Sequence, residues 1–132
     1  MSEPVDPGVI ALAARVFDLA RSGSTEELEA YLDAGVPVEL TNDRGDTLLV
    51  LAAYHAHPAT VAALLARGAE HGRANDRGQT ALAAAVFRRS EPIVRALLDA
   101  GADPDAGSPS ARETAAFFEL PEMSALLQGP PR

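Results

Sequence analysis

Residues 42–107 decide the fold, because they contain the same sequence unit twice. Residues 42–74 read NDRGDTLLVLAAYHAHPATVAALLARGAEHGRA, and residues 75–107 read NDRGQTALAAAVFRRSEPIVRALLDAGADPDAG. A shift of 33 residues aligns the two copies with 13 identical positions, which include NDRG, the next threonine and a Leu-Leu pair. A repeat near this period is typical of arrays that are built from one supersecondary unit.

Each copy predicts a turn followed by two helices. The NDRG segment has turn chemistry, because short polar side chains mimic backbone turns and glycine tolerates a positive φ. Thr47 and Thr80 are the expected N-caps of a short first helix. The second helix is expected to end where Gly68 or Gly101 adopts the left-handed conformation. The pattern therefore predicts an all-α solenoid of helix–turn–helix units joined by short hairpin-like turns.

The pattern extends toward the N-terminus, where Gly35 lies 33 residues before the next helix-ending glycine. A preceding helix is expected, in which apolar residues from Val9 to Ala20 wrap one broad face. Ser24 and Glu27 form a candidate capping box for the helix that follows. The first unit differs from the internal copies in its first half, as an end repeat with one face in water is expected to do.

Beyond residue 107 a helix–turn–helix pattern returns in a form that is shorter by about one turn. Its glutamates are expected to face solvent, which suits a C-terminal cap. The expected division of the chain is a loose N-terminus at 1–8, an N-capping repeat at 9–41, internal repeats at 42–74 and 75–107, a shortened C-capping repeat at 108–128 and a disordered tail at 129–132.

Composition favours packed helices and disfavours several classes of function. The chain has 132 residues, of which 47% are hydrophobic and 5% aromatic, with no cysteine and a net charge of −8. A nucleic-acid binder normally shows a basic stripe, and thiolate metal sites need cysteine. No apolar run reaches the about 20 residues of a membrane span, and the N-terminus lacks the basic start of a secretory signal. We expect a cytoplasmic monomer that binds neither nucleic acid nor membrane.

These residues resemble the ankyrin repeat over about residues 9–128. The shared features are a Gly-x-Thr-x-Leu turn, paired alanines and leucines, and a Gly-Ala pair followed by an acidic residue. The family's Pro and His after the threonine are replaced by Leu48 and Val50 in one copy and by alanines in the other. The tetratricopeptide repeat is a less suitable alternative, because its period is 34 residues and its helices are longer. The resemblance implies a small, stand-alone protein of bacterial type with about four repeats.

The resemblance also implies a concave face, lined by turn tips and first helices, that grips a protein partner. The partner-binding residues that it implies are Arg21, Asp43, Arg44, Asp46, Tyr54, His55, Asp76, Arg77, Gln79, Phe87 and Arg88. Aromatic side chains with arginine are typical of interface hot spots, and the planar guanidinium suits carboxylates. Two other interpretations stay open: Tyr54 and Phe87 pack on each other across repeats, and the Asp-Arg pairs are solvated turn residues that contribute little.

No motif predicts catalysis. The chain lacks a G-x-S-x-G nucleophile elbow and the Gly-rich phosphate loops. His55, His57 and His71 do not have the spacing of a zinc site, and His57 matches the family's loop histidine that bonds to backbone. We therefore expect no catalytic residue, no metal and no cofactor.

Four hypotheses about function remain at the level of sequence. The first is an adaptor that binds one protein partner. The second is an acidic inhibitor or immunity-type partner of a basic toxin or enzyme, because a charge of −8 would steer association. The third is an enzyme with an unrecognised site, and the fourth is self-association through an uncapped end.

Overall fold

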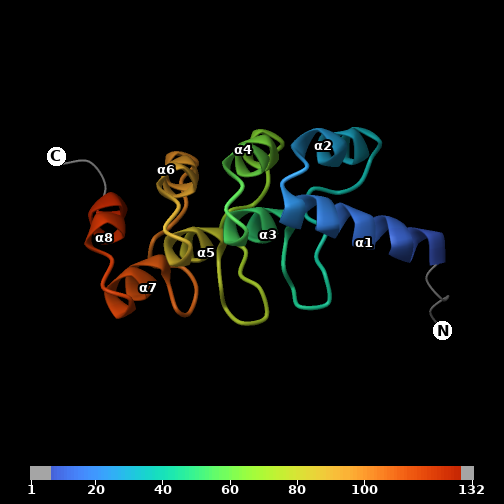
Figure 1. Cartoon of the computed structure of the whole chain (residues 1–132). Helices are drawn as coiled ribbons and strands as arrows, with labels where there is room; N and C mark the ends of the chain where they lie inside the picture. Colours follow the sequence, from blue (N-terminus) through green and yellow to red (C-terminus); the bar gives the residue numbers. More distant parts are fainter. Residues whose placement is uncertain (1–6, 129–132) are drawn as a thin grey trace.

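Eight helices alternate in two rows along residues 7–128, the part of the chain that this computed structural model describes (Figure 1). The helices are α1 (Pro7–Ser22), α2 (Thr25–Asp33), α3 (Leu48–Tyr54), α4 (Pro58–Ala66), α5 (Ala81–Phe87), α6 (Glu91–Asp99), α7 (Ala111–Phe117) and α8 (Pro121–Leu127). Residues 7–128 contain two isolated β-bridges and no strand, so the predicted all-α class is confirmed. The expectations for residues 1–6 and 129–132 lie outside the described residues.

The odd-numbered helices form an inner row, and the even-numbered helices form an outer row (Figure 1). Each inner helix packs against the outer helix that follows it and against its neighbours in the inner row. The loops that lead from an outer helix to the next inner helix extend past the inner row, on the side away from the outer row (Figure 1). Because each unit contacts its sequence neighbours, the fold is a linear array, with α1 and α8 at opposite ends.

Threonine hydroxyls start the inner helices α3 and α5, as the sequence predicts. Thr47 accepts a hydrogen bond from the backbone N–H of Val50 at 3.1 Å, and Thr80 accepts one from Ala83 at 3.1 Å. Both threonines are buried, so these bonds satisfy N–H groups that water does not reach. Each threonine therefore fixes the start of its helix relative to the turn before it.

The predicted capping box of Ser24 and Glu27 is wrong. Ser24 is the N-cap of α2, but its side chain makes no capping hydrogen bond, and Glu27 instead pairs with Arg15 of α1 at 2.8 Å. A capping box occurs at α7, where Ser110 accepts from the N–H of Glu113 at 3.1 Å and the Glu113 carboxylate accepts from the N–H of Ser110 at 3.0 Å. The two serines also differ in their surroundings, because the Ser24 hydroxyl is bonded to the hydroxyl of Ser22 at 2.8 Å, and the backbone of Ser110 is extended whereas that of Ser24 is not.

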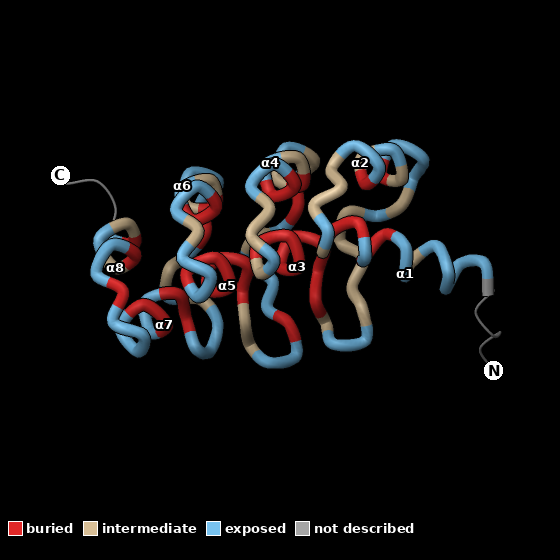
Figure 2. Tube along the Cα trace, in the orientation of Figure 1, coloured by how far each residue is buried: buried red, intermediate tan, exposed pale blue. Residues whose placement is uncertain are grey.

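The inner row forms the core of the array (Figure 2). Every residue of α3 except Tyr54 and every residue of α5 except Phe87 is buried. Alanine supplies much of this surface in α5, and its small side chain lets neighbouring helices pack closely on both sides. The outer helices bury one face only, through residues such as Leu64 and Leu97. Burial of α3 and α5 leaves only their last residues, Tyr54 and Phe87, available at the surface.

The first half of α1 is uncovered, which differs from the predicted apolar face. Val9 is 55% exposed, Ile10 is 56% exposed and Leu12 is 39% exposed. Helix α1 has 16 residues whereas α2 has 9, and the start of α1 projects beyond α2 (Figure 1). Apolar residues of α1 are therefore fully buried only from Val16 onward.

Candidate functional site

Asparagine side chains shape the two internal turns. The Asn42 Oδ1 atom accepts hydrogen bonds from the N–H groups of Arg44 and Asp46, both at 2.9 Å. Asn75 makes the equivalent pair of bonds in the next turn, both at 3.0 Å. A backbone bond also closes each turn, such as the one from the N–H of Asn42 to the carbonyl of Asp46 at 3.1 Å. These bonds hold the side chains of the turn tips in a fixed position next to the inner row.

Asp46 is a link between turns, although the sequence predicted it as an exposed contact residue. The side chain is buried, and its Oδ1 atom accepts from the Nδ2 group of Asn75 at 2.7 Å. Its Oδ2 atom accepts from the Nδ2 group of Asn42 at 3.2 Å. The N–H of Asp76 adds a backbone bond to the carbonyl of Arg44 at 3.0 Å. The two turns are therefore joined by hydrogen bonds although Val50 replaces the histidine of the ankyrin pattern.

Four aromatic side chains form a continuous aromatic strip at the ends of the inner helices: Tyr54, Phe87, Phe118 and Phe117. The rings of Tyr54 and Phe87 are nearly parallel, with centroids 6.1 Å apart and an interplanar angle of 8°. Phe118 contacts Phe87 edge-on at 5.4 Å and Phe117 at 4.9 Å. Tyr54 is half-buried, whereas Phe87, Phe118 and Phe117 are 40%, 44% and 79% exposed. Tyr54 thus both packs against the core and borders the surface, and the phenylalanines lie open to solvent.

A hollow of about 290 Å³ lies next to the aromatic strip, and we call it the inner hollow. It is lined by Arg21, Asn42, Arg44, Asp46, Val50, Leu51, Tyr54, His55, Arg77 and Gln79. These residues come from α1, from both internal turns and from α3, so three successive units build it. Tyr54 belongs to both features, and the inner hollow is therefore continuous with the aromatic strip.

Three arginines of the inner hollow and strip have no ion pair in the described part of the chain, whereas arginines on the outer row are paired. The outer-row Arg67 pairs with Asp33 at 2.8 Å, and the outer-row Arg95 pairs with Glu91 at 2.8 Å. Arg44, Arg77 and Arg88 form no ion pair within residues 7–128, although Arg21 is bonded to Asp18 at 2.9 Å. The Arg88 guanidinium lies 5.9 Å from the centroid of the Tyr54 ring, within cation–π range. In a chain with a net charge of −8, this surface thus presents three arginines that have no ion pair within residues 7–128.

Two histidines lie at the same end of α3. The Nε2 atom of His57 donates to the carbonyl of Arg21 at 2.7 Å, so its predicted backbone bond is confirmed. The pKa of His55 is lowered from its ordinary value of 6.5, first by partial burial of the ring and then by the positive charges of His57, Arg21 and Arg88. Burial of the ring is the larger cause, and the three basic neighbours act in the same direction.

The structure brings most of the predicted contact residues together. Seven of them line the inner hollow, namely Arg21, Arg44, Asp46, Tyr54, His55, Arg77 and Gln79. Phe87 belongs to the aromatic strip, and Arg88 lies over the ring of Tyr54. Asp43 and Asp76 are exposed on the turn tips and do not line this hollow. The predicted set is thus a single surface, except that the two tip aspartates lie at its edge.

Sequence reasoning missed Phe117 and Phe118. The signal was present, because the last residue of α3, α5 and α7 follows the N-cap at the same distance: Thr47 precedes Tyr54, Thr80 precedes Phe87, and Ser110 precedes Phe117, by seven positions. Residues 108–128 do not fit the 33-residue period, so the positions equivalent to Tyr54 and His55 were not evident there. Counting from the N-cap, instead of along the 33-residue repeat, would have found both phenylalanines.

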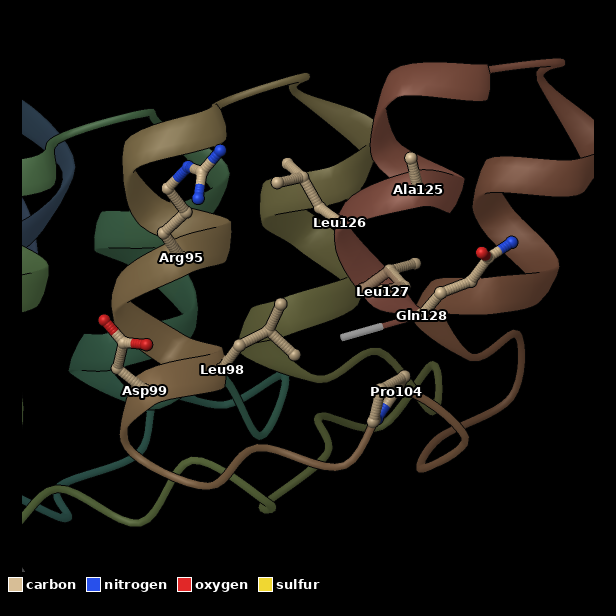
Figure 3. A pocket seen from close by; sticks show the side chains of 8 residues that line it. All are labelled: Arg95, Leu98, Asp99, Pro104, Ala125, Leu126, Leu127 and Gln128. Atoms are coloured by element: carbon tan, nitrogen blue, oxygen red, sulfur yellow. The ribbon is translucent and has the colours of Figure 1, made fainter. Parts of the chain in front are cut away.

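A second hollow lies on the other side of the array, between α6 and α8 (Figure 3). Its volume is larger, at about 540 Å³. Apolar residues such as Leu98 and Leu126 line it together with Arg95 and Asp99. The Arg95 guanidinium is already paired with Glu91 at 2.8 Å. This outer hollow contains none of the predicted contact residues and offers no free positive charge.

Neither a metal cluster nor a membrane span occurs in residues 7–128. No group of three or more His, Cys, Asp or Glu side chains in this range is placed to hold a metal ion. In the same range, no helix combines the length and the apolar character needed to cross a bilayer.

Comparisons with known proteins agree on one family. A family profile described as ankyrin repeats, in three copies, matches residues 16–108. A putative ankyrin repeat protein of Pseudomonas aeruginosa is 51% identical over 47 residues, which are 36% of this chain. The crystal structure of the human ASB11 ankyrin repeat domain has a TM-score of 0.78 at 26% identity and covers 86% of this chain. The matches span 28% of the bacterial relative and 52% of the human chain, so each relative is considerably longer than the part compared.

Proposed function

The chain belongs to the ankyrin repeat family, and from that membership we propose that it is a non-enzymatic module that binds a protein partner through its inner face. The inner face comprises the turn tips, the inner hollow and the aromatic strip. Ankyrin repeats are generally protein–protein interaction modules, in which a stacked scaffold presents variable surface residues. We assign the repeats to residues 9–41, 42–74 and 75–107, with residues 108–128 as the C-terminal cap.

One observation carries the proposal: unpaired arginines lie beside exposed aromatic rings on a single surface. Arg44 and Arg77 line the inner hollow without an ion pair inside the described range, and Phe87 and Phe118 are exposed in the adjoining strip. Exposed aromatic rings and free arginines do little for folding, whereas buried at an interface they supply most of the binding energy. The surface therefore has the composition of a binding site and no evident structural need for it.

The acidic-inhibitor alternative is supported by the net charge of −8. The local pairing of carboxylates weighs against it, since Glu29 and Asp33 share Arg67, and Asp105 pairs with Arg112. The two proposals differ in the sign of one effect. Removing a positive charge with Arg77→Gln should weaken binding of an acidic partner and strengthen binding of a basic one.

The test of the proposal is capture of the partner by matched variants. Phe87→Ser combined with Phe118→Ser removes two exposed rings of the strip, and Ile10→Ser removes an exposed apolar side chain of α1. We expect the double variant to lose the partner that the wild-type chain captures from its native cell, because hot-spot aromatics contribute about 2 kcal/mol or more each. The Ile10→Ser control should retain it.

Circular dichroism melting of all three proteins keeps the test informative. Both variants should unfold cooperatively above the capture temperature, because each replaced side chain is partly exposed in the folded state. If the folded double variant captures the same partner as well as the wild type does, then binding through the inner face is wrong.

A further inference from the structure

The inner hollow has a chemistry that is more specific than a general contact surface. Its lining includes three arginines and one carboxylate, that of Asp46. Both oxygen atoms of that carboxylate are already occupied, since they accept from the side-chain amides of Asn75 and Asn42. The carboxylate of Asp46 therefore forms no ion pair with Arg44 or Arg77, although all three residues line the hollow.

The aspartates of the turn tips form no ion pair with these arginines either. Asp43 and Asp76 adjoin Arg44 and Arg77 in sequence, but no ion pair joins them in the described part of the chain. A guanidinium group presents several N–H donors in a planar fork, and this geometry matches the two oxygen atoms of a carboxylate. Two such groups at one hollow form a site for an anionic oxygen ligand.

Gln79 adds an unsatisfied polar atom to the same hollow. Its side-chain Oε1 atom is shielded from solvent and has no hydrogen-bond partner among residues 7–128. The equivalent residue of the previous turn, Asp46, is bonded to Asn75 of the next turn, whereas the turn after Gln79 has Ser108 in place of that asparagine. Because this oxygen is shielded from solvent, a ligand that donates an N–H group, such as a peptide backbone, satisfies it only after the Gln79 side chain turns toward the hollow.

The hollow also continues along the array. A smaller hollow of about 200 Å³ shares Arg77 and Gln79 with it and extends to Pro109 and Thr114. On the other side, Tyr54 connects it to the aromatic strip, whose ring centroids are spaced at 6.1 and 5.4 Å. Those two steps together match roughly three residues of an extended chain, which rises about 3.3–3.6 Å per residue. The dimensions suit a short extended peptide segment.

We propose that the inner hollow is a carboxylate-binding subsite, in which Arg44 and Arg77 bind the side chain of an aspartate or glutamate from an extended segment of the partner. This inference rests on the proposed function and names the chemistry of the partner. An apolar or aromatic residue within about three positions of that acidic residue lies on the aromatic strip. Nucleic acid is disfavoured as the ligand, because the chain's net charge of −8 repels a polyanion at long range.

The test selects ligands from a random peptide library displayed on phage, with the wild-type protein as bait. We expect the selected peptides to carry Asp or Glu close to an aromatic or branched apolar residue. A selected peptide and its copy with Gln for Glu, or Asn for Asp, are then titrated by fluorescence anisotropy. The acidic peptide should bind roughly tenfold tighter or more, since a charge-assisted bond to arginine is lost in the copy.

Protein variants locate the effect. The acidic peptide and its neutral copy should bind Arg44→Gln with nearly equal affinity, and likewise Arg77→Gln, so the ratio of the two affinities falls close to one. It should persist in Arg95→Gln, which removes the same charge from an arginine already paired on the outer row. Single-stranded DNA is titrated in parallel and should bind none of these proteins.

Four results would overturn the inference: no peptide is enriched, enriched peptides lack acidic residues, the ratio is unchanged in both hollow variants, or DNA binds and is lost in Arg44→Gln. The failure of the subsite is distinguishable from the failure of the proposed function. If peptides bind without an acidic requirement but are lost in Phe87→Ser, the inner face binds partners and the subsite is wrong. If neither Phe87→Ser nor the arginine variants affect peptide binding, both are wrong.

Discussion

Equivalent residues of the two near-identical turns make different hydrogen bonds. Asp46 and Gln79 occupy the same place in successive copies, yet Asp46 bonds to the next turn and Gln79 keeps an unsatisfied oxygen atom. The difference arises because Asn75 donates to the aspartate, and the last turn has no asparagine to repeat the bond. One aligned position therefore makes a link between turns in the first copy and, among residues 7–128, makes none in the second.

The titration of His55 tests the local charge of the inner face. Its pKa is lowered from 6.5 by partial burial and by His57, Arg21 and Arg88. NMR titration of the ring should give a value below 6.5, and Arg88→Gln should raise it, because one repulsive charge is removed. The control Arg95→Gln should leave it unchanged, since that guanidinium is paired with Glu91.

The lowered pKa of His55 also determines how the unfolding free energy changes with pH. The unfolded chain binds the proton of His55 more readily than the folded chain, so protonation destabilises the folded state as the pH falls below 6.5. Between about pH 7.5 and about pH 5.5, the wild type should lose more unfolding free energy than His55→Gln does. A His55 pKa at or above 6.5 would mean that carboxylates, not arginines, dominate the potential there.

At the scale of the element, the outer helices α2, α4 and α6 are each followed by a glycine in the left-handed conformation. Gly68 and Gly101 have φ angles of 82° and 98°, as the sequence predicts. A Cβ atom on Gly68 would contact nothing within 4 Å, so the cost of a side chain there is conformational alone. A substitution at Gly68 therefore measures the cost of backbone strain without any steric overlap.

Gly68→Val should lower the unfolding free energy by roughly 1–2 kcal/mol, because a β-branched residue does not readily adopt the left-handed conformation. Gly72→Val is the matched control: Gly72 also has open space around it but does not have a left-handed φ. Urea unfolding of the control should change by no more than about 0.5 kcal/mol. Equal effects of the two substitutions would show that Gly68 is not a required helix exit.

Elements that depend on local and periodic signals were predictable from the sequence. The caps Thr47 and Thr80 and the glycine exits recur in both copies, and each acts through a bond or angle within a few residues. The capping box at Ser24 failed because a residue of another helix, Arg15, binds Glu27. A pairing of that kind depends on how α1 packs beside α2, which local patterns do not encode.

At the scale of the molecule, the array and the gathering of the predicted residues on one face were predictable, but the hollow was not. The repeat period implies stacking, and stacking places Tyr54 beside Phe87. The inner hollow needs residues from three units, and the burial of Asp46 needs a donor 29 residues away. The exposed start of α1 likewise depends on what lies next to it, so the predicted apolar face alone did not show that Val9 and Ile10 are uncovered.

The most direct test of the central claim is a map of where a partner binds on the folded chain. Backbone amide shifts of the isotope-labelled protein would be followed by NMR as the captured partner or a selected peptide is added. Binding through the inner face predicts that the largest shifts lie in the internal turns, at the ends of α3 and α5 and at Phe118, with α4 and α6 little changed. Shifts concentrated in α4 and α6, on the outer row, would contradict it.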